Sequence, residues 1–286
     1  MTMSSQYITT GMSKRELTGT ALKLCAMITM LIDHIGASIL ERYILINGYM
    51  ADGVVYEVTW HYMLDCVLRL IGRLAFPIYI FLLVEGAIHT SNKWKYLGRL
   101  SLFALISEIP FDIAFCISGS AVKRGTVLDL GYQNVFFTLA IGLLTIIIID
   151  SLHQIKMDRF PNVLMQVFVC LFGMSLAIYL RTDYSWEGVL AIVVVYVMKT
   201  RINLNKIHTA KQYGEKEIEK KKNLIAVASG CLLLTLVNPV EITSFLDVAL
   251  IGRYNGQRGS NIKLLFYAFY PVHLFVLGLI CIATGL

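Results

Sequence analysis

An aspartate and a histidine stand side by side within a long apolar segment, "AMITMLIDHIGASIL" (residues 26–40). Asp33 and His34 are the only ionisable residues of this segment. A charge in the middle of a membrane costs about 2.5–3.5 kcal/mol, so such residues face the protein interior and usually serve a function. Histidine exchanges protons near neutral pH and acts as a general base toward amines or hydroxyls when a partner fixes its tautomer. The pair therefore indicates proton-transfer chemistry inside a membrane domain.

The next two apolar segments each carry a pair of charged residues one helical turn apart. Arg69 and Arg73 share a helix face, and so do Glu108 and Asp112. The arginines either neutralise nearby carboxylates or extend along the helix to the membrane interface. The two carboxylates either hold a substrate or serve as counter-ions of the arginines. Asp33 is also open to two roles, as partner of the adjacent histidine or in an ion pair with an arginine, because neighbouring helical residues point about 100° apart.

Other polar residues are expected at a similar depth. Asn134 begins the fourth apolar segment and His273 lies near the middle of the last one, whereas Asp183 and Glu187 fall in a short turn, as pocket residues or as ordinary loop charges. Arginine and asparagine side chains can donate hydrogen bonds to an oxyanion, which suits acyl transfer. The same residues would also suit proton-coupled transport. The sequence has no G-x-S-x-G or H-E-x-x-H motif, which disfavours a serine hydrolase or a zinc protease.

The elements that position these residues are membrane-spanning helices. The chain is 57% hydrophobic and 15% charged, with mean hydropathy +0.67, whereas soluble domains carry about 25% charged residues. We expect an all-α polytopic integral membrane helix bundle of about 8–10 spans, forming one domain over residues 19–286 after a polar flank at 1–18. The expected spans are 20–40, 66–87, 96–117, 134–152, 163–180, 186–199, 224–237 and 264–286. The apolar piece at 242–251 is a further span, a broken helix or a re-entrant turn.

The basic residues indicate an orientation. If the piece at 242–251 crosses as well, most of the 25 lysines and arginines fall in loops on one side, including the Lys-rich loop at about 200–223. The positive-inside rule then places the N-terminus in the cytoplasm and the C-terminus outside. The first span would act as an uncleaved insertion signal. The net charge of +6 does not suggest nucleic acid, because it lies in these loops.

The cysteine spacing and one glycine-containing loop indicate which cofactors to expect. The six cysteines form no C-x-x-C pair, so metal or redox chemistry is not expected. The stretch "IGRYNGQRGSNIK" (residues 251–263) combines glycines with basic residues at the predicted cytoplasmic end of the last span. Such a loop can hold phosphates, but basic residues on that side are also what topology demands.

Longer stretches resemble the TraX family, in the same order from about Leu22 to near the C-terminus. They are "LKLCAMITMLIDHIG", "LRLIGRLAFPIYIFLLVEG", "GRLSLFALISEIPFDIAF", "NVFFTLAIGLL" and "YNGQRGSNIKLLFYAFYPVHL". TraX of conjugative plasmids is associated with N-terminal acetylation of the pilin subunit, and the family resembles transmembrane acyltransferases. The resemblance implies an acetyl-CoA-dependent N- or O-acetyltransferase of the bacterial inner membrane, without a metal. It would deliver acetyl to a peptide, pilin or glycan acceptor on the far side.

The resemblance also implies roles for individual residues. His34 would be the catalytic base or a transient acetyl carrier, with Asp33 as its partner or as a structural ion pair. Arg69 and Arg73 would stabilise negative charge on the thioester oxygen or contact the pantetheine arm. The substrate-binding set, with Glu108 and Asp112 holding the acceptor or those arginines, would be Glu108, Asp112, Asn134, Tyr270 and His273. The set that holds the CoA phosphates would be Arg253, Tyr254, Asn255, Arg258 and Lys263.

Two other functions fit the same residues. In a proton-coupled transporter, Asp33, His34 and Glu108 would form a proton relay, and internal inverted repeats would favour that reading. We find no such repeat in the sequence. In a non-catalytic scaffold of a secretion or conjugation machine, the polar residues would serve folding alone. The oligomeric state and the acceptor stay open.

Overall fold

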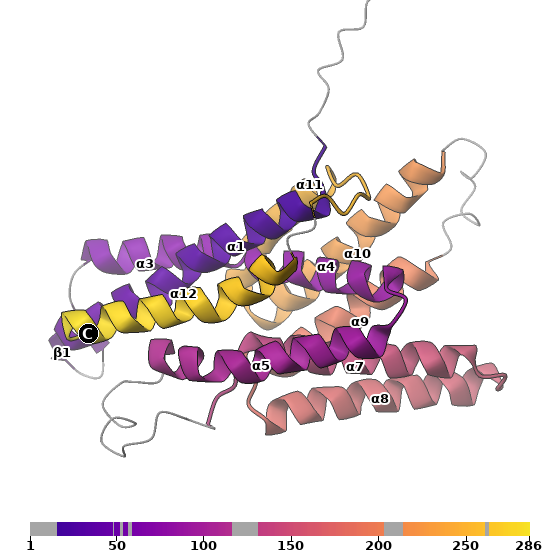
Figure 1. Cartoon of the computed structure of the whole chain (residues 1–286), viewed down its shortest axis with the longest axis horizontal. Helices are drawn as coiled ribbons and strands as arrows, with labels where there is room; N and C mark the ends of the chain where they lie inside the picture. The colour runs from indigo at the N-terminus through magenta and orange to yellow at the C-terminus, as the bar shows by residue number, and fades with distance from the viewer. Residues whose placement is uncertain are drawn as a thin grey trace, which may run out of the picture.

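The computed structural model describes residues 16–47, 49–51, 54–56, 59–115, 131–202, 214–260 and 263–286. Within them the protein is a bundle of long helices that run close to the long axis of the molecule (Figure 1), with one two-stranded hairpin. The elements are α1 (Gly19–Ile35), η1 (Gly36–Leu40), α2 (Glu41–Asn47), β1 (Tyr49–Ala51), β2 (Val54–Tyr56), α3 (Thr59–Gly72), α4 (Ala75–His89), α5 (Lys93–Phe115), α7 (Val135–Gln154), α8 (Arg159–Tyr179), α9 (Ser185–Arg201), α10 (Glu215–Val237), η3 (Pro239–Phe245), α11 (Leu246–Ile251) and α12 (Lys263–Thr284).

The bundle has the character of a membrane domain. Among the described residues, 5 helical stretches are long and apolar enough to cross a membrane. They are Gly19–Asn47, Trp60–His89, Val135–Gln154, Arg159–Tyr179 and Leu264–Thr284. The prediction of an all-α polytopic membrane bundle is thus confirmed. The polar flank at 1–15 and residues 203–213 of the Lys-rich loop lie outside the described part.

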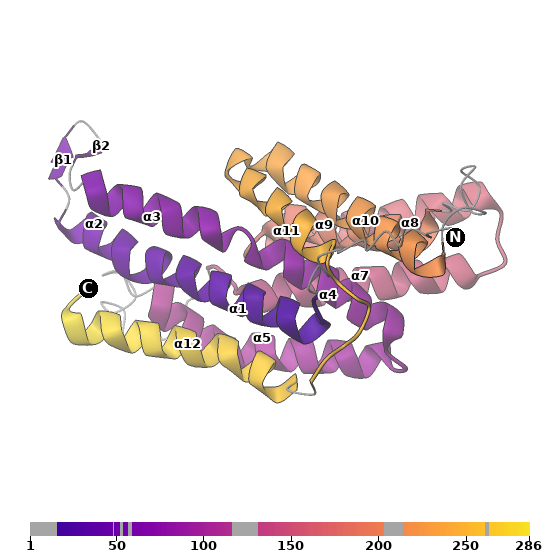
Figure 2. The same ribbon diagram turned by 90° about the horizontal axis from the view of Figure 1, so that it is seen from above.

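Two predicted spans are interrupted in ways that matter for the site. The stretch Trp60–His89 is divided into α3 and α4 at Arg73 and Leu74. The piece at 242–251 is a broken helix, in which the 3₁₀ helix η3 is followed by the short α11 and both pack back along α10 (Figure 2). The side chain of Asn238 begins η3 by accepting a hydrogen bond from the backbone N–H of Val240 at 3.2 Å.

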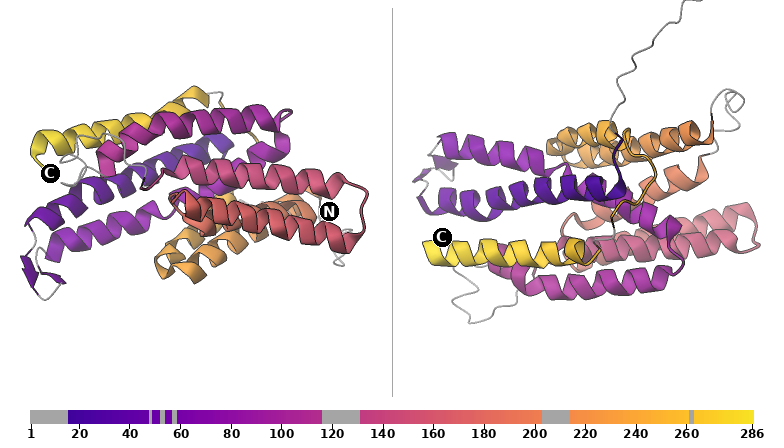
Figure 3. Two further views of the ribbon diagram at one scale, coloured as in Figure 1. Left: turned by 90° about the horizontal axis from the view of Figure 1, so that it is seen from below. Right: turned by 45° about the horizontal axis from the view of Figure 1, so that its top comes forward.

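The long helices mostly alternate in direction, except that α4 continues onward from α3 (Figures 1 and 2). The connections from α4 to α5, α7 to α8 and α11 to α12, together with the start of α1, lie in the right-hand half of Figure 2. The described C-terminus lies at the left-hand end. Seen from below, α7 and α8 run side by side (Figure 3). Basic residues therefore gather toward one end of the bundle, as the loop pattern predicts.

The first helix changes its winding directly after the Asp33–His34 pair. Thr18 caps α1 by accepting a hydrogen bond from the N–H of Ala21 at 3.3 Å. One turn of π-helix, η1, then joins α1 to α2. The hydroxyl of Ser38 donates a hydrogen bond to the carbonyl of His34 at 2.5 Å. Single π turns inside helices are frequent at functional sites because they change the direction in which side chains point.

Candidate active site

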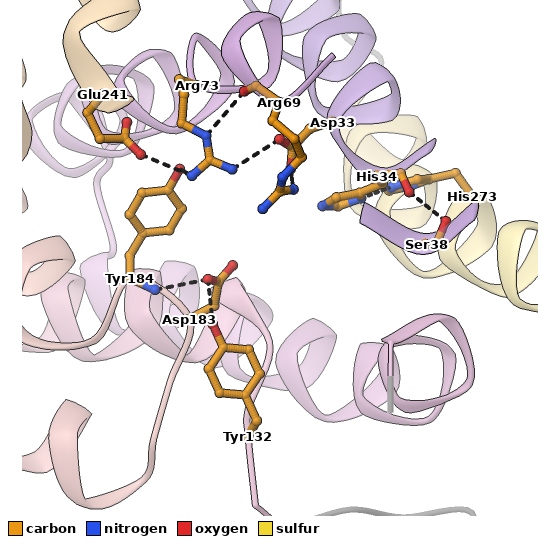
Figure 4. A network of polar contacts seen from close by, with 10 residues as sticks. All are labelled: Asp33, His34, Ser38, Arg69, Arg73, Tyr132, Asp183, Tyr184, Glu241 and His273. Carbon is orange, nitrogen blue, oxygen red and sulfur yellow. Dashed lines mark hydrogen bonds and ion pairs between the residues drawn. The ribbon is translucent and has the colours of Figure 1, made fainter. Parts of the chain in front are cut away.

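Asp33 lies between the two arginines that the sequence placed on one helix face. Its Oδ2 accepts a hydrogen bond from Nη1 of Arg69 at 2.7 Å, and its Oδ1 accepts one from Nη2 of Arg73 at 3.1 Å (Figure 4). Arg73 stands where α3 ends, and its Nε donates to the carbonyl of Arg69 at 3.3 Å. Of the two roles open to Asp33, the structure shows the ion pair with the arginines.

Arg73 has two further partners that the sequence did not indicate. Its Nη1 donates to Oε1 of Glu241 at 3.0 Å and to the hydroxyl oxygen of Tyr184 at 3.4 Å. Glu241 belongs to the broken helix η3, and Tyr184 belongs to the turn before α9. One guanidinium thereby connects α1, η3 and the α8–α9 turn. The only available signal was that Glu241 directly precedes an apolar segment.

Close packing of α1 against α3 brings the ion pair together at Gly72. A methyl group added at Gly72 would collide with the side chain of Asp33. We expect Gly72→Ala to destabilise the protein by about 1–3 kcal/mol, as overpacked positions do, because Asp33 must then move away from the arginines. The midpoint of thermal unfolding of the purified protein measures this. Gly98→Ala is the control, because a methyl group there meets nothing within 4 Å. Equal midpoints for the two variants would contradict the prediction.

His34 faces a second histidine on the last helix. Its Nδ1 lies 2.7 Å from Nε2 of His273, and the two rings are nearly parallel, with 6° between their planes. The other nitrogen of His273, Nδ1, lies 2.7 Å from the carbonyl oxygen of Phe269. That carbonyl can only accept, so Nδ1 of His273 carries a proton and, in the neutral ring, Nε2 is an acceptor. His34 must then donate from Nδ1, which leaves Nε2 of His34 with its lone pair.

Aromatic rings surround the histidine pair. Phe115 and Tyr270 lie edge-on to the ring of His34, with centroids 5.3 and 5.9 Å away. Tyr270 is buried and also packs edge-on against Phe136 at 4.8 Å. The structure thus brings His34, Tyr270 and His273 together, as the sequence predicted. His34 itself is half-buried.

A cavity of about 560 Å³ leads from one end of the bundle to this aromatic cluster. Its volume is within the range of about 300–1,000 Å³ that is usual for small-molecule sites. The inner part is apolar and aromatic, and Tyr270 is one of its lining residues. The charged lining residues are Lys23, Arg99 and Arg258 with one carboxylate, Glu85, so positive charges outnumber negative ones. The cavity could accept a long ligand with an anionic end and an apolar arm.

The loop between α11 and α12 forms one wall of the cationic end. The backbone N–H and the hydroxyl of Thr20 both donate to the carbonyl of Arg258, each at 3.0 Å. Gly256 and Gly259 have φ of +77°, a conformation that favours glycine. Of the predicted phosphate-binding set, Tyr254 and Arg258 line the cavity.

The rest of that predicted set lies elsewhere. Arg253 is exposed and its carbonyl accepts from the N–H of Leu17 at 2.7 Å, whereas the side chain of Asn255 accepts from the N–H of Gln257 at 2.9 Å. Neither Arg253 nor Asn255 is among the residues that line the cavity. The side chain of Lys263 lies outside the described part of the structure.

Comparison with known proteins bears on this arrangement. The family model described as "TraX protein" matches residues 18–281. The chain belongs to the TraX family. This TraX-family chain is also 31% identical over 272 residues, 90% of its own length and 92% of the relative's, to a protein of Dichelobacter nodosus named "Probable fimbrial assembly protein FimC, serogroup H1". No solved structure matches it.

In this TraX-family protein the carboxylate of Glu108 binds an asparagine and not an arginine. Asn134 caps α7 by accepting from the N–H of Phe136 at 3.0 Å, and its Nδ2 donates to Oε2 of Glu108 at 2.5 Å and to the carbonyl of Ala104 at 2.9 Å. The pair joins α5 to α7. Asp112 is buried one turn further along α5. The counter-ions of the arginines in the structure are Asp33 and Glu241.

The turn between α8 and α9 is strained where it faces the arginines of this TraX-family site. Arg181, Tyr184 and Ser185 have φ of 52°, 57° and 33°, which is costly for residues other than glycine. The carboxylate of Asp183 accepts from the hydroxyl of Tyr132 at 2.9 Å and from the N–H of Tyr184 at 3.0 Å. These contacts hold the turn so that Tyr184 reaches Arg73. Glu187 follows in the first turn of α9.

Proposed function

We propose that this multi-pass membrane protein is an acetyltransferase. It would take acetyl from cytoplasmic acetyl-CoA and transfer it to an amine or hydroxyl of an acceptor at the opposite face. The observation that supports this most strongly is the cavity, which has cationic side chains at one end and reaches Tyr270, edge-on to His34, at the other. A thioester with an anionic headgroup fits both ends of such a space.

The proposed orientation follows from charge. The connections that carry most lysines and arginines lie toward the end of the bundle where the cavity has its cationic residues. The positive-inside rule assigns that end, with the N-terminus, to the cytoplasm. Acetyl-CoA is made and kept in that compartment, so its phosphates would meet Lys23, Arg99 and Arg258 first. The pantetheine arm would follow the apolar part of the cavity inward.

His34 is the proposed general base. Its Nε2 would take the proton from the acceptor's N–H or O–H as the acceptor's nitrogen or oxygen attacks the thioester carbonyl carbon. The carbon–sulfur bond then breaks, and His34 returns the proton to the thiolate that leaves. Arg69 keeps one-third of its side chain exposed and could donate to the oxyanion formed on the way. Asp33, next in sequence, would act through Arg69, whose guanidinium it holds in place by an ion pair.

A pilin-type peptide is the acceptor that we propose. The Dichelobacter relative is named as a fimbrial assembly protein, and the resemblance of the sequence to TraX implies the same class of acceptor. A glycan would meet the same chemical requirement with a hydroxyl group. Mass spectrometry of a synthetic pilin N-terminal peptide and of a disaccharide, each incubated with the protein and acetyl-CoA, separates these two acceptors.

Binding of the donor tests the proposal without a known acceptor. We expect the purified protein to bind acetyl-CoA, and Arg258→Gln to weaken binding about tenfold, because each charge-assisted phosphate contact contributes on the order of 1.5–3 kcal/mol. Isothermal titration calorimetry in detergent measures the affinity. Arg159→Gln is the matched control, since Arg159 is exposed and is not among the cavity-lining residues. A protein that binds no acetyl-CoA, or two variants of equal affinity, would reject this assignment of the cavity.

A further inference from the structure

A second set of buried oxygen atoms lies on the broken helix, beyond Glu241. Ser244 and Asp247 follow Glu241 at intervals of three residues. A 3₁₀ helix has three residues per turn, so Glu241 and Ser244 fall on one face of η3, and Asp247 follows in the first turn of α11. All three side chains are buried, with relative exposures of 2% for Glu241, 0% for Ser244 and 0% for Asp247. Here η3 and α11 pack against α10.

Several of these side-chain oxygen atoms have no hydrogen-bond partner within the described part of the chain. Among the described residues, no hydrogen bond reaches Oε2 of Glu241, Oγ of Ser244 or either carboxylate oxygen of Asp247. The hydroxyl of Thr235, on the facing helix α10, is also buried and without a partner there. One turn earlier on α10, Sγ of Cys231 lies 3.3 Å from the carbonyl of Ser244, so α10 contacts η3 at this position. An unmade hydrogen bond of a buried polar group costs about 1–3 kcal/mol, and several here would be a large sum.

The charges are also unbalanced. Oε1 of Glu241 is bound by Arg73, but Arg73 is shared with Asp33. Asp247 has no ion pair with a lysine, arginine or histidine of the described residues, and the carboxylate of Glu241 is close enough to repel it. A carboxyl group so deep in a membrane domain either stays protonated or has a positive charge beside it. Carboxylate and hydroxyl oxygens are the ligands that hard cations prefer.

We propose that Glu241, Ser244 and Asp247, with Thr235 facing them, bind a single alkali-metal cation of the sodium class. One positive charge would balance Asp247, which favours a monovalent ion, and interrupted helices bind Na⁺ in other membrane proteins. The cation would fix the carboxylate of Glu241, whose other oxygen anchors Arg73. This inference does not depend on the acetyltransferase proposal, because it concerns binding of an ion and not transfer of an acetyl group.

The test compares thermal unfolding of the purified protein in NaCl and in N-methylglucamine chloride at constant ionic strength. We expect sodium to raise the unfolding midpoint by several degrees in a saturable way, because a ligand that binds only the folded state stabilises it. Asp247→Asn should lose this dependence, and Ser244→Ala should move its half-saturation to at least about tenfold higher sodium, the weakening that 1.4 kcal/mol produces. Glu217→Gln, which changes an exposed carboxylate on the same helix α10, should respond like the wild type.

Direct binding of ²²Na⁺ to the wild type and to Ser244→Ala provides a second measurement if Asp247→Asn does not fold. A wild-type midpoint that is the same in both salts at every concentration would overturn the proposal, and Asp247 would then be held as a neutral acid. A sodium response that persists unchanged in both Asp247→Asn and Ser244→Ala would overturn it as well. Replacement of sodium by potassium shows which alkali ion fits better.

Discussion

Replacement of His34 by alanine is expected to abolish acetyl transfer while the protein stays folded. The ring is proposed to take the acceptor's proton, and general-base catalysis contributes about 10²–10⁴ to the rate. Its removal takes away no ion pair with a carboxylate, because the polar partner of the His34 ring in the structure is the imidazole of His273. Release of free CoA thiol and the mass of the acetylated acceptor measure the reaction. The unfolding midpoint monitors the fold.

Two companion variants sharpen this prediction. His153→Ala changes an exposed histidine in the last turn of α7 and should leave acetyl transfer unchanged. His273→Phe keeps an aromatic ring but removes the acceptor that fixes the tautomer of His34, so we expect a lower kcat with little change in the KM for acetyl-CoA. A base with a free tautomer should also show an altered pH profile of kcat, which a purely structural defect would not. Full activity of His34→Ala would remove the histidine from the mechanism.

Replacement of Arg73 by alanine is expected to cost the largest amount of stability, about 3–5 kcal/mol, because it leaves buried carboxylates without their cation. Asp33 and Glu241 both lose an ion-pair partner, and the hydroxyl of Tyr184 loses its hydrogen-bond donor. Arg73→Lys keeps the positive charge and should recover part of the lost stability. The recovery should be incomplete, because one ammonium cannot reach three acceptors as a planar guanidinium does. Unfolding of the purified protein in a denaturing detergent series measures the difference.

A double-mutant cycle tests whether the loss comes from this network. Glu241→Gln removes one of the carboxylates, so Arg73→Ala should cost less in that background than in the wild type, by at least about 1 kcal/mol. Arg159→Ala, an exposed arginine at the start of α8, serves as the reference. If Arg73→Ala is no more destabilising than Arg159→Ala, or if the two losses simply add, the ion-pair network is not what holds these helices.

The positions of the helices could be predicted from the sequence because apolar length is a strong signal in a membrane domain. The division of Trp60–His89 into two helices could not, since no proline marks the break at Arg73 and Leu74. Convergence of Asp33, Arg69 and Arg73 followed from their depth and their shared faces. Which carboxylate neutralises which arginine did not, because the pairing depends on which helices are neighbours.

Other parts of the site could not be predicted from the sequence. Glu241 follows Asn238-Pro239, where a charged residue usually belongs to a solvated loop, and only the folding of η3 back along α10 buries it. Tyr184 is an uncharged residue in a turn, so the sequence does not predict its contact with Arg73. The cavity is bounded by α1, α4, α5, α7, α12 and the α11–α12 loop, so it exists only once these elements are assembled.

The aromatic rings around His34 would limit the access of water to its imidazole. Phe115 and Tyr270 lie edge-on to its imidazole, and Phe136 packs edge-on against Tyr270. If acetyl-CoA is the donor as proposed, the base that activates an amine would activate a water molecule just as readily. A bare histidine would turn the protein into a thioesterase that consumes the cell's acetyl-CoA to no purpose. The rings would keep water out until an acceptor fills that place, so that hydrolysis of acetyl-CoA would be slow in the absence of an acceptor.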